Sequence, residues 1–290
     1  MTANHAHAHA HAHDHQHGVF DDAALADMID LDGEVLAGYL DEVTAWTAGF
    51  APQPGTIVDL GPGTGTGTAA LARRFPDASI VALDASEPML DRVRAKAREL
   101  GLDGRVRAEL ADVDARWPDT ATPDLVWTVS TLHHLADPER VLRDVHAALA
   151  PDGVVVAVEM DDQPRFLTDD GGTGLEDRAR AVMADAGWNA HPDYQPLLER
   201  VGFEVTRRRF TIDVAPLPDS ARRYALAFLG RLRVALSDRL GPDDLALLDR
   251  LVAADGPESV LVRDDLAVRG TRTAWVGRRT SGRAQSRATS

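Results

Sequence analysis

The chain has 290 residues, 44% of them hydrophobic, so it can bury one large core or a core with a smaller cap. Its formal net charge of −15 repels phosphate backbones, so we expect no nucleic-acid partner. The absence of cysteine excludes disulfides, thiolate metal sites and cysteine nucleophiles, and it fits a reducing cytoplasm.

The first 17 residues contain seven alternating histidines, in the stretch HAHAHAHAHDHQH. In an extended chain these side chains share one face and could chelate a divalent metal, but the low complexity favours a disordered tail, natural or added as a tag. We predict disordered tails over 1–18 and 280–290 and no metal site in the fold. The sequence contains no apolar run of about 18 residues, so it indicates no membrane span, and we expect no membrane partner.

Residues 19–50 show apolar residues at helical spacing, with Asp32 as a plausible cap, and we predict a helical N-terminal lid there. Strands and helices then alternate, and several strands are nearly continuous apolar runs, which is typical of strands covered on both faces. The pattern predicts an α/β fold with a Rossmann-like, doubly wound, mostly parallel seven-stranded sheet. The first five predicted strands are 56–60, 79–84, 105–110, 124–129 and 153–160, and the helices among them are 66–75, 87–100 and 138–149.

The second half of the chain continues with helices near Glu176 and Tyr194 and with predicted strands over 203–214 and 271–278. About 50 residues separate these two strands, which is long for a connection within a sheet. We predict a helical cap insertion over 219–255 within a domain spanning 51–279, and a flap that only stabilises the fold is the alternative.

The stretch IVDLGPGTGTGTAAL, residues 57–71, places four alternating glycines between a predicted strand and a predicted helix. A P-loop would end in lysine followed by serine or threonine, and this loop contains no lysine. A dinucleotide loop of the form G-x-G-x-x-G would place its third glycine at position 66, which is threonine. The match to that motif is incomplete, and a dinucleotide site stays open as an alternative.

Four stretches resemble the class I S-adenosylmethionine-dependent methyltransferases in order and spacing. VDLGPGTGTG resembles the family's first motif, VALDASEPML the second-strand motif, and LADVD the adenine-contact segment. Residues 124–159 resemble its fourth strand, fourth helix and fifth strand, so that the resemblance covers 55–159. It implies S-adenosylmethionine as the cofactor, bound by Asp59, Gly61, Gly63, Gly65, Asp84, Ala85, Met89, Asp112, Val113 and Ser130.

Physical reasons support several of these contacts. Glycines let the backbone approach the methionine moiety, and the helix N-terminus at Thr66 favours its carboxylate. Asp84 ends a predicted strand and can accept both ribose hydroxyls. Asp112 can accept from the adenine amine, with Asp114 as the competing acid.

The chemistry of methyl transfer needs alignment and exclusion of water, and it needs a base only if the acceptor must lose a proton. The catalytic candidates at the strand ends are His133, His134 and Glu159, although one histidine could instead pack under a helix and the other line the cofactor wall. The substrate-binding candidates, each of which could instead be a core residue, are Tyr39, Trp46, His191, Tyr194 and Phe228.

We therefore expect a cytoplasmic enzyme, monomeric or homodimeric, that methylates a small molecule such as a specialised metabolite by in-line displacement. Oxygen, nitrogen and carbon acceptors all stay open. The alternatives are a methyltransferase acting on a peptide, an NAD(P)-dependent reductase, and a non-catalytic cofactor-binding protein.

Overall fold

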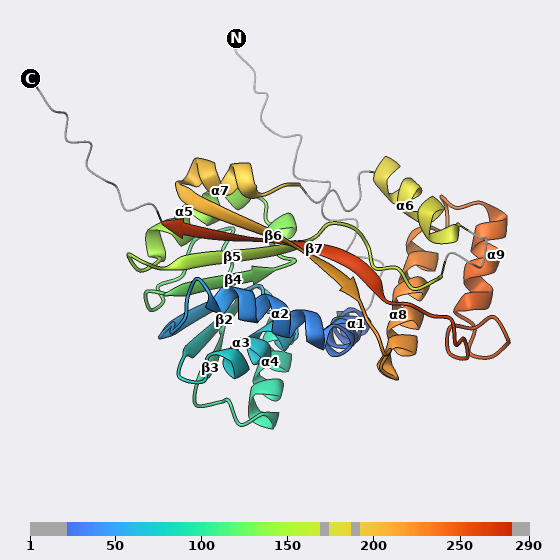
Figure 1. Cartoon of the computed structure of the whole chain (residues 1–290), viewed down its shortest axis with the longest axis horizontal. Coiled ribbons are helices and arrows are strands. Elements are labelled where there is room, and N and C mark those ends of the chain that lie inside the picture. The colour runs from blue at the N-terminus through green and yellow to red at the C-terminus, as the bar shows by residue number, and fades with distance from the viewer. Residues whose placement is uncertain (1–21, 169–173, 187–191, 280–290) are drawn as a thin grey trace, which may run out of the picture. The chain divides into compact units, whose positions relative to one another are not determined.

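The computed structural model of the chain describes residues 22–168, 174–186 and 192–279, which fall into two compact units (Figure 1). Of the described residues, the first unit contains 36–165, 192–216 and 268–279. The second contains 22–35, 166–168, 174–186 and 217–267. Each unit has its own buried apolar residues.

The first unit contains a seven-stranded sheet in the order β3-β2-β1-β4-β5-β7-β6. All neighbouring strands are parallel except that β7 runs antiparallel to both β5 and β6. The predicted mostly parallel sheet is thereby confirmed. The strands are β1 (Thr56–Leu60), β2 (Ser79–Asp84), β3 (Val106–Leu110), β4 (Leu125–Val129), β5 (Val154–Met160), β6 (Phe203–Asp213) and β7 (Arg269–Arg279).

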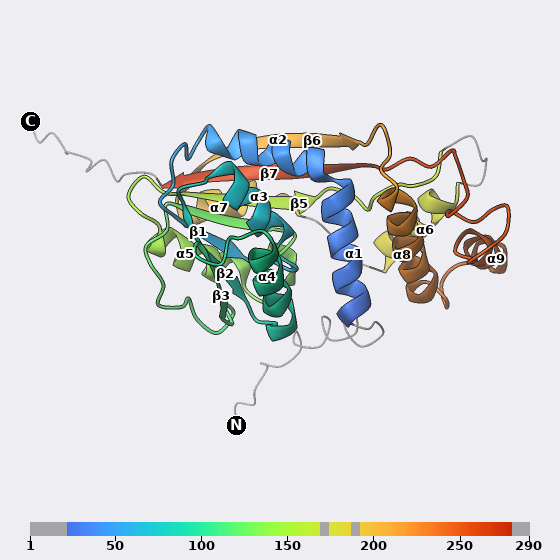
Figure 2. The same cartoon turned by 90° about the horizontal axis from the view of Figure 1, so that it is seen from below.

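Helices cover both faces of this sheet, which explains why its central strands are apolar on both sides (Figures 1 and 2). One face carries α2 (Ala37–Ala48), α3 (Thr66–Arg74) and α4 (Glu87–Glu99). The other carries α5 (Pro138–Ala148) and α7 (Gln195–Val201). Two of these helices begin at side-chain caps that the sequence provides, since Ser86 accepts from the backbone of Met89 and Asp137 from that of Arg140.

The second unit is helical and contains α1 (Asp22–Val35), α6 (Leu175–Asp185), α8 (Ser220–Ala235) and α9 (Pro242–Leu251). Helix α1 packs on α8, and the hydroxyl of Tyr224 donates to Asp32 at 2.6 Å. Phe166 is fully buried and packs edge-on against Tyr224. Helices α8 and α9 occupy the long connection between β6 and β7, where the sequence predicts two helices.

The described part of the N-terminal segment is helical and forms two helices. Helix α1 ends at Val35 and α2 begins at Ala37, with Leu36 between them at φ −96° and ψ 21°. Gly33 and Gly38 flank this break, and glycine costs about 1 kcal/mol relative to alanine inside a helix. The prediction of Asp32 as a helix cap is wrong, since Asp32 lies inside α1.

Candidate active site

The glycine loop joins β1 to α3 and holds three glycines in the left-handed region, with φ of +69° at Gly61, +53° at Gly63 and +83° at Gly65. A Cβ atom on Gly61 would come within 2.3 Å of the Thr131 hydroxyl oxygen. A Cβ atom on Gly65 would lie 3.1 Å from the Cα of Val93. Backbone conformation and close packing therefore both require small residues here.

Asp84 ends β2 beside this loop. Its Oδ1 accepts a hydrogen bond of 2.8 Å from the Ser86 N–H. Burial raises the pKa of Asp84, while hydrogen bonds from the backbone N–H groups of Ser86, Gly63 and Ala85 oppose the rise. Because Gly63 belongs to the glycine loop, the half-buried carboxylate faces that loop, as a ribose contact requires.

Asp59 lies in β1 and is buried, with 2% of its surface exposed. Burial raises the pKa of Asp59 to about 7; the Thr68 hydrogen bond lowers it, and the charge of Asp84 raises it further. The Thr68 hydroxyl donates to Oδ2 of Asp59 at 2.6 Å, which ties α3 to β1. The predicted contact of Asp59 with the cofactor stays a prediction.

This raised pKa predicts a pH dependence of stability. The fold disfavours the ionised form of Asp59, so ionisation of this group lowers the free energy of unfolding. This loss is absent below the unfolded pKa of 3.8, grows as the pH rises to about 7, and is constant above that. We expect this group to lower the free energy of unfolding by on the order of 4 kcal/mol across that range, at about 1.4 kcal/mol per pKa unit. Asp59→Asn removes the titrating group and should flatten the dependence in urea unfolding measured at several pH values. The same pH slope in variant and wild type would contradict this assignment.

The segment after β3 contains the acids predicted to meet the adenine. Oδ1 of Asp112 accepts from the backbone N–H groups of Asp114 and Ala115, at 3.0 and 3.3 Å. Both carboxylate oxygens of Asp114 accept from the Ala136 N–H at 3.1 Å. Asp114 therefore joins this turn to the chain after β4, which leaves Asp112 as the better candidate for the adenine. Val113 is buried, Met89 is half-buried in the first turn of α4, and Ala85 is exposed.

The turn after β4 brings two catalytic candidates into direct contact. Nδ1 of His133 lies 2.7 Å from Oε2 of Glu159, and Oε1 of the same carboxylate accepts from the Leu132 N–H at 2.9 Å. The Glu159 side chain is 1% exposed and that of His133 is 22% exposed. His134 is exposed, with its ring centre 4.0 Å from that of His133. His133 is thus the histidine that the buried acid holds.

Comparison with known proteins gives a family for the part of the chain that contains the glycine loop. Residues 57–153 match the family described as a methyltransferase domain. This part of the chain is a methyltransferase domain. Trans-aconitate 2-methyltransferase of Variovorax paradoxus is 36% identical over 137 residues, which are 47% of this chain and 48% of that protein. The chain spans about half the length of the curated relatives it matches.

Solved structures show the methyltransferase fold over more of the chain. An O-methyltransferase family protein from Burkholderia thailandensis has a TM-score of 0.54 at 18% identity, covering 90% of this chain and 60% of that one. The YcgJ protein of Bacillus subtilis has a TM-score of 0.51 at 12% identity, covering 84% of this chain and 100% of that one. At these identities the likeness concerns the fold alone.

S-adenosylmethionine is the cofactor of this domain class, and the residues present fit it. The left-handed glycines Gly61, Gly63 and Gly65 present backbone rather than side chains, and the methionine moiety would approach this backbone. The carboxylate of Asp84 lies at the neighbouring strand end, where it would hold the ribose, and Asp112 follows the next strand, where it would meet the adenine amine. These assignments of individual contacts are proposals.

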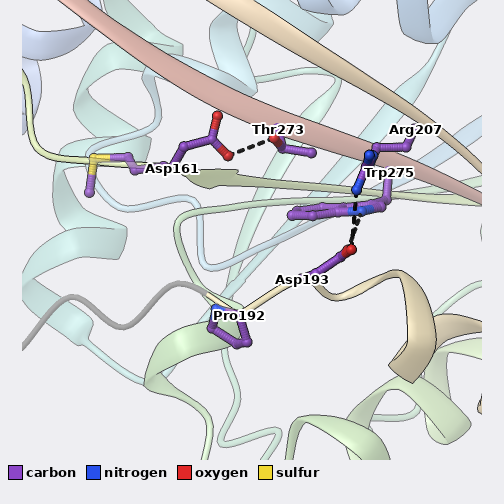
Figure 3. A pocket seen from close by; sticks show the side chains of 7 residues that line it. Asp161, Pro192, Asp193, Arg207, Thr273 and Trp275 are labelled. Atoms are coloured by element: carbon purple, nitrogen blue, oxygen red, sulfur yellow. Dashed lines mark hydrogen bonds and ion pairs between the residues drawn. The ribbon is translucent and has the colours of Figure 1, made fainter. Parts of the chain in front are cut away.

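A hollow of about 130 Å³ opens on the sheet of the methyltransferase domain beside the end of β5 (Figure 3). The Thr273 hydroxyl donates to Asp161 at 2.6 Å, and the indole N–H of Trp275 donates to Asp193 at 3.1 Å. Arg207 forms an ion pair with Asp193 at 3.1 Å. Sequence reasoning missed Asp161, Thr273 and Arg207. Asp161 follows a parallel strand directly, and residues at that position commonly face the ligand crevice, so the sequence could have indicated it. Thr273 and Arg207 depend on where β6 and β7 enter the sheet.

Within the first unit, the predicted substrate-binding residues lie on both faces of the sheet. Tyr39 and Trp46 pack edge-on against Phe210, on the sheet face that α2 covers. Tyr194 packs against Trp275, and side-chain alternation along β6 and β7 places that contact on the opposite face. Phe228 lies in the second unit, where it packs on Phe166, and His191 lies outside the described residues. Of this set, Tyr194 has the clearest relation to the catalytic candidates, since the charge of Glu159 adds to burial in raising its pKa.

Proposed function

We propose that the chain is an S-adenosylmethionine-dependent methyltransferase that acts on a small molecule, such as a specialised metabolite. The observation that carries this proposal is the gathering of the glycine loop, Asp84 and the His133–Glu159 pair at the ends of consecutive strands of one methyltransferase sheet. When bound, S-adenosylmethionine supplies a methyl group on a positively charged sulfur that leaves as a neutral thioether. The chain's own residues hold the cofactor, exclude water and align the acceptor.

The acceptor is chosen by parts of the chain that the curated relatives do not match. Relatives named for trans-aconitate and for malonyl-[acyl-carrier protein] share at most about half of their own length with this chain. The matching family model spans residues 57–153 and so contains the cofactor loop, which supports the cofactor more strongly than the acceptor. The helical N-terminal lid over 19–50 and the cap over 219–255 stay proposals, with a stabilising flap as the alternative for the cap.

Other functions stay as alternatives. A peptide acceptor, a nicotinamide-dependent reductase and a non-catalytic binder would each use the same fold. We also propose a cytoplasmic location and a monomeric or homodimeric state. In the parts of the chain that the structure describes, no helix has the length and apolar character to cross a membrane.

Titration calorimetry separates these functions at the level of the cofactor. We expect the full chain to bind S-adenosylmethionine and S-adenosylhomocysteine and to show no heat with NAD. Binding of NAD in place of S-adenosylmethionine would overturn the proposed function. Binding of S-adenosylmethionine, without methyl transfer to any component of a metabolite extract, would favour the non-catalytic binder.

Deletion of residues 1–17 is expected to leave cofactor affinity and methyl transfer unchanged within twofold. The histidine-rich segment lies outside every predicted strand and helix, and the cofactor residues are all beyond position 58. Calorimetry and transfer of a labelled methyl group measure both properties. If the shortened chain instead lost more than tenfold of its methyl transfer, and added zinc changed that loss, the histidine-rich segment would have a metal-linked role.

A further inference from the structure

A single buried carboxylate fixes both the backbone and the ring of the turn after β4. Glu159 uses Oε1 to accept from the Leu132 N–H and Oε2 to meet Nδ1 of His133. When the Glu159 carboxylate is ionised it accepts hydrogen bonds only, and Nδ1 is then the donor of this contact. In a neutral imidazole the lone pair is then on Nε2, which becomes the basic nitrogen of the pair.

The same turn is held from its other side by the cofactor loop. Ser130 takes a φ of +52°, the one left-handed non-glycine residue among the described ranges, and its N–H donates to the Val158 carbonyl at 2.8 Å. Such a conformation costs free energy and persists only where the surroundings impose it. Thr131 packs against Gly61, where a Cβ atom would meet its side chain. The turn that carries His133 is therefore fixed relative to the loop that would hold the cofactor.

The hollow in the sheet is lined by a residue that pairs with Glu159 across two strands. In the antiparallel pairing of β5 and β7, Glu159 is directly opposite Thr273, so both side chains point to the same face of the sheet. Thr273 lines the hollow with Asp161 (Figure 3). Among the described residues, His134 and Tyr194 are titratable groups beside the pair, and the raised pKa of Tyr194 keeps its phenol protonated.

We propose that Glu159 is a positioning residue that makes Nε2 of His133 a general base, and that the acceptor is a hydroxyl group. This inference rests on the proposed methyl transfer. The hydroxyl oxygen forms its bond to the methyl carbon while the carbon–sulfur bond breaks with its electrons left on sulfur, and the hydroxyl proton moves to Nε2. A carboxylate acceptor arrives without a proton and a neutral amine attacks before losing one, so a built base is of most use to a hydroxyl acceptor.

The first test reads the histidine directly and needs no acceptor. Nitrogen-15 chemical shifts of the His133 ring in the ligand-free full chain report which nitrogen is protonated. We expect a non-protonated Nε2 in the wild type and a changed tautomer mixture in Glu159→Gln, whose amide can donate to Nδ1. Glu204→Gln is the matched control, because Glu204 is an exposed acid on β6. A wild type with a non-protonated Nδ1, or an unchanged tautomer in Glu159→Gln, would overturn the positioning role.

The second test identifies the methylated atom. S-adenosylmethionine carrying a carbon-13 methyl group is incubated with the full chain and a metabolite extract of the organism that encodes it. A labelled methoxy ether is the expected product. Glu159→Gln should form it at least tenfold more slowly, with cofactor affinity unchanged within twofold, and Glu204→Gln should match the wild type.

The alternative products separate the two proposals. A labelled ester, which mild alkali cleaves, or a labelled N-methyl or C-methyl group would overturn the hydroxyl acceptor while methyl transfer stood. A chain that binds no S-adenosylmethionine in calorimetry, or that binds it and labels nothing, would overturn the proposed function and this inference with it.

Discussion

Asp84→Ala should lower the affinity for S-adenosylmethionine at least tenfold. If the carboxylate holds the ribose through two hydrogen bonds, the variant loses both, and bonds to a charged group contribute roughly 1.5–3 kcal/mol each without being additive. A loss of about 1.4 kcal/mol already corresponds to a tenfold change in the dissociation constant. The half-buried position of Asp84 beside the N–H of Gly63 supports this expectation, because such a carboxylate is poorly screened by solvent.

Matched variants make the Asp84 result specific. Asp84→Asn keeps the volume but loses the charge and one acceptor, so its affinity should lie between those of wild type and Asp84→Ala. Asp91→Ala is the control, since Asp91 is an exposed acid on α4 that pairs with Arg94 at 2.9 Å. Calorimetry measures the affinities, and circular dichroism checks that each variant is folded. Wild-type affinity in Asp84→Ala would leave the fold in place and show that the ribose lies elsewhere.

The sheet and the cofactor loop could be predicted because their signals are local. Strands such as β5 are continuous runs of buried apolar residues, and α4 begins at a serine cap followed within two residues by a proline. Position at a strand end also selected Asp84, His133 and Glu159, because the ends of parallel strands share one edge of the sheet. Every one of these features is set by neighbours within a few residues in the chain.

The remaining features depend on distant parts of the chain. His133 and Glu159 are 26 residues apart, and adjacent histidines in the sequence do not show which one meets the acid. Thr273 faces Glu159 only because β7 inserts antiparallel between β5 and β6. The left-handed conformation of Ser130 has no residue signal either, since serine, unlike glycine, does not favour it. The apolar spacing of the N-terminal segment predicts helix but does not show that the helix breaks at Leu36.

Gly61→Ala should damage both stability and cofactor binding, since Gly61 contacts Thr131 in the turn after β4. A Cβ atom there would lie 2.3 Å from the hydroxyl oxygen and 2.5 Å from the methyl carbon of Thr131. A left-handed conformation costs a non-glycine residue roughly 1–2 kcal/mol, and overpacking adds about 1–3 kcal/mol. We therefore expect the free energy of unfolding in urea to fall by about 2–5 kcal/mol, and cofactor affinity to fall with it because the loop must shift.

Two further variants separate backbone strain from the clash. Gly101 has a similar φ of +67° with no atom within 4 Å of its added Cβ, so Gly101→Ala measures the backbone cost alone. Thr131→Ala removes the two atoms nearest to the added Cβ, so the double variant Gly61→Ala/Thr131→Ala should be less destabilised than the sum of its single variants. The coupling free energy from this double-mutant cycle shows whether the added Cβ at position 61 meets the Thr131 side chain. If the two substitutions had additive effects on the free energy of unfolding, or if Gly61→Ala and Gly101→Ala were equally destabilised, the glycine loop and the turn after β4 would not be packed against each other as the structure has them.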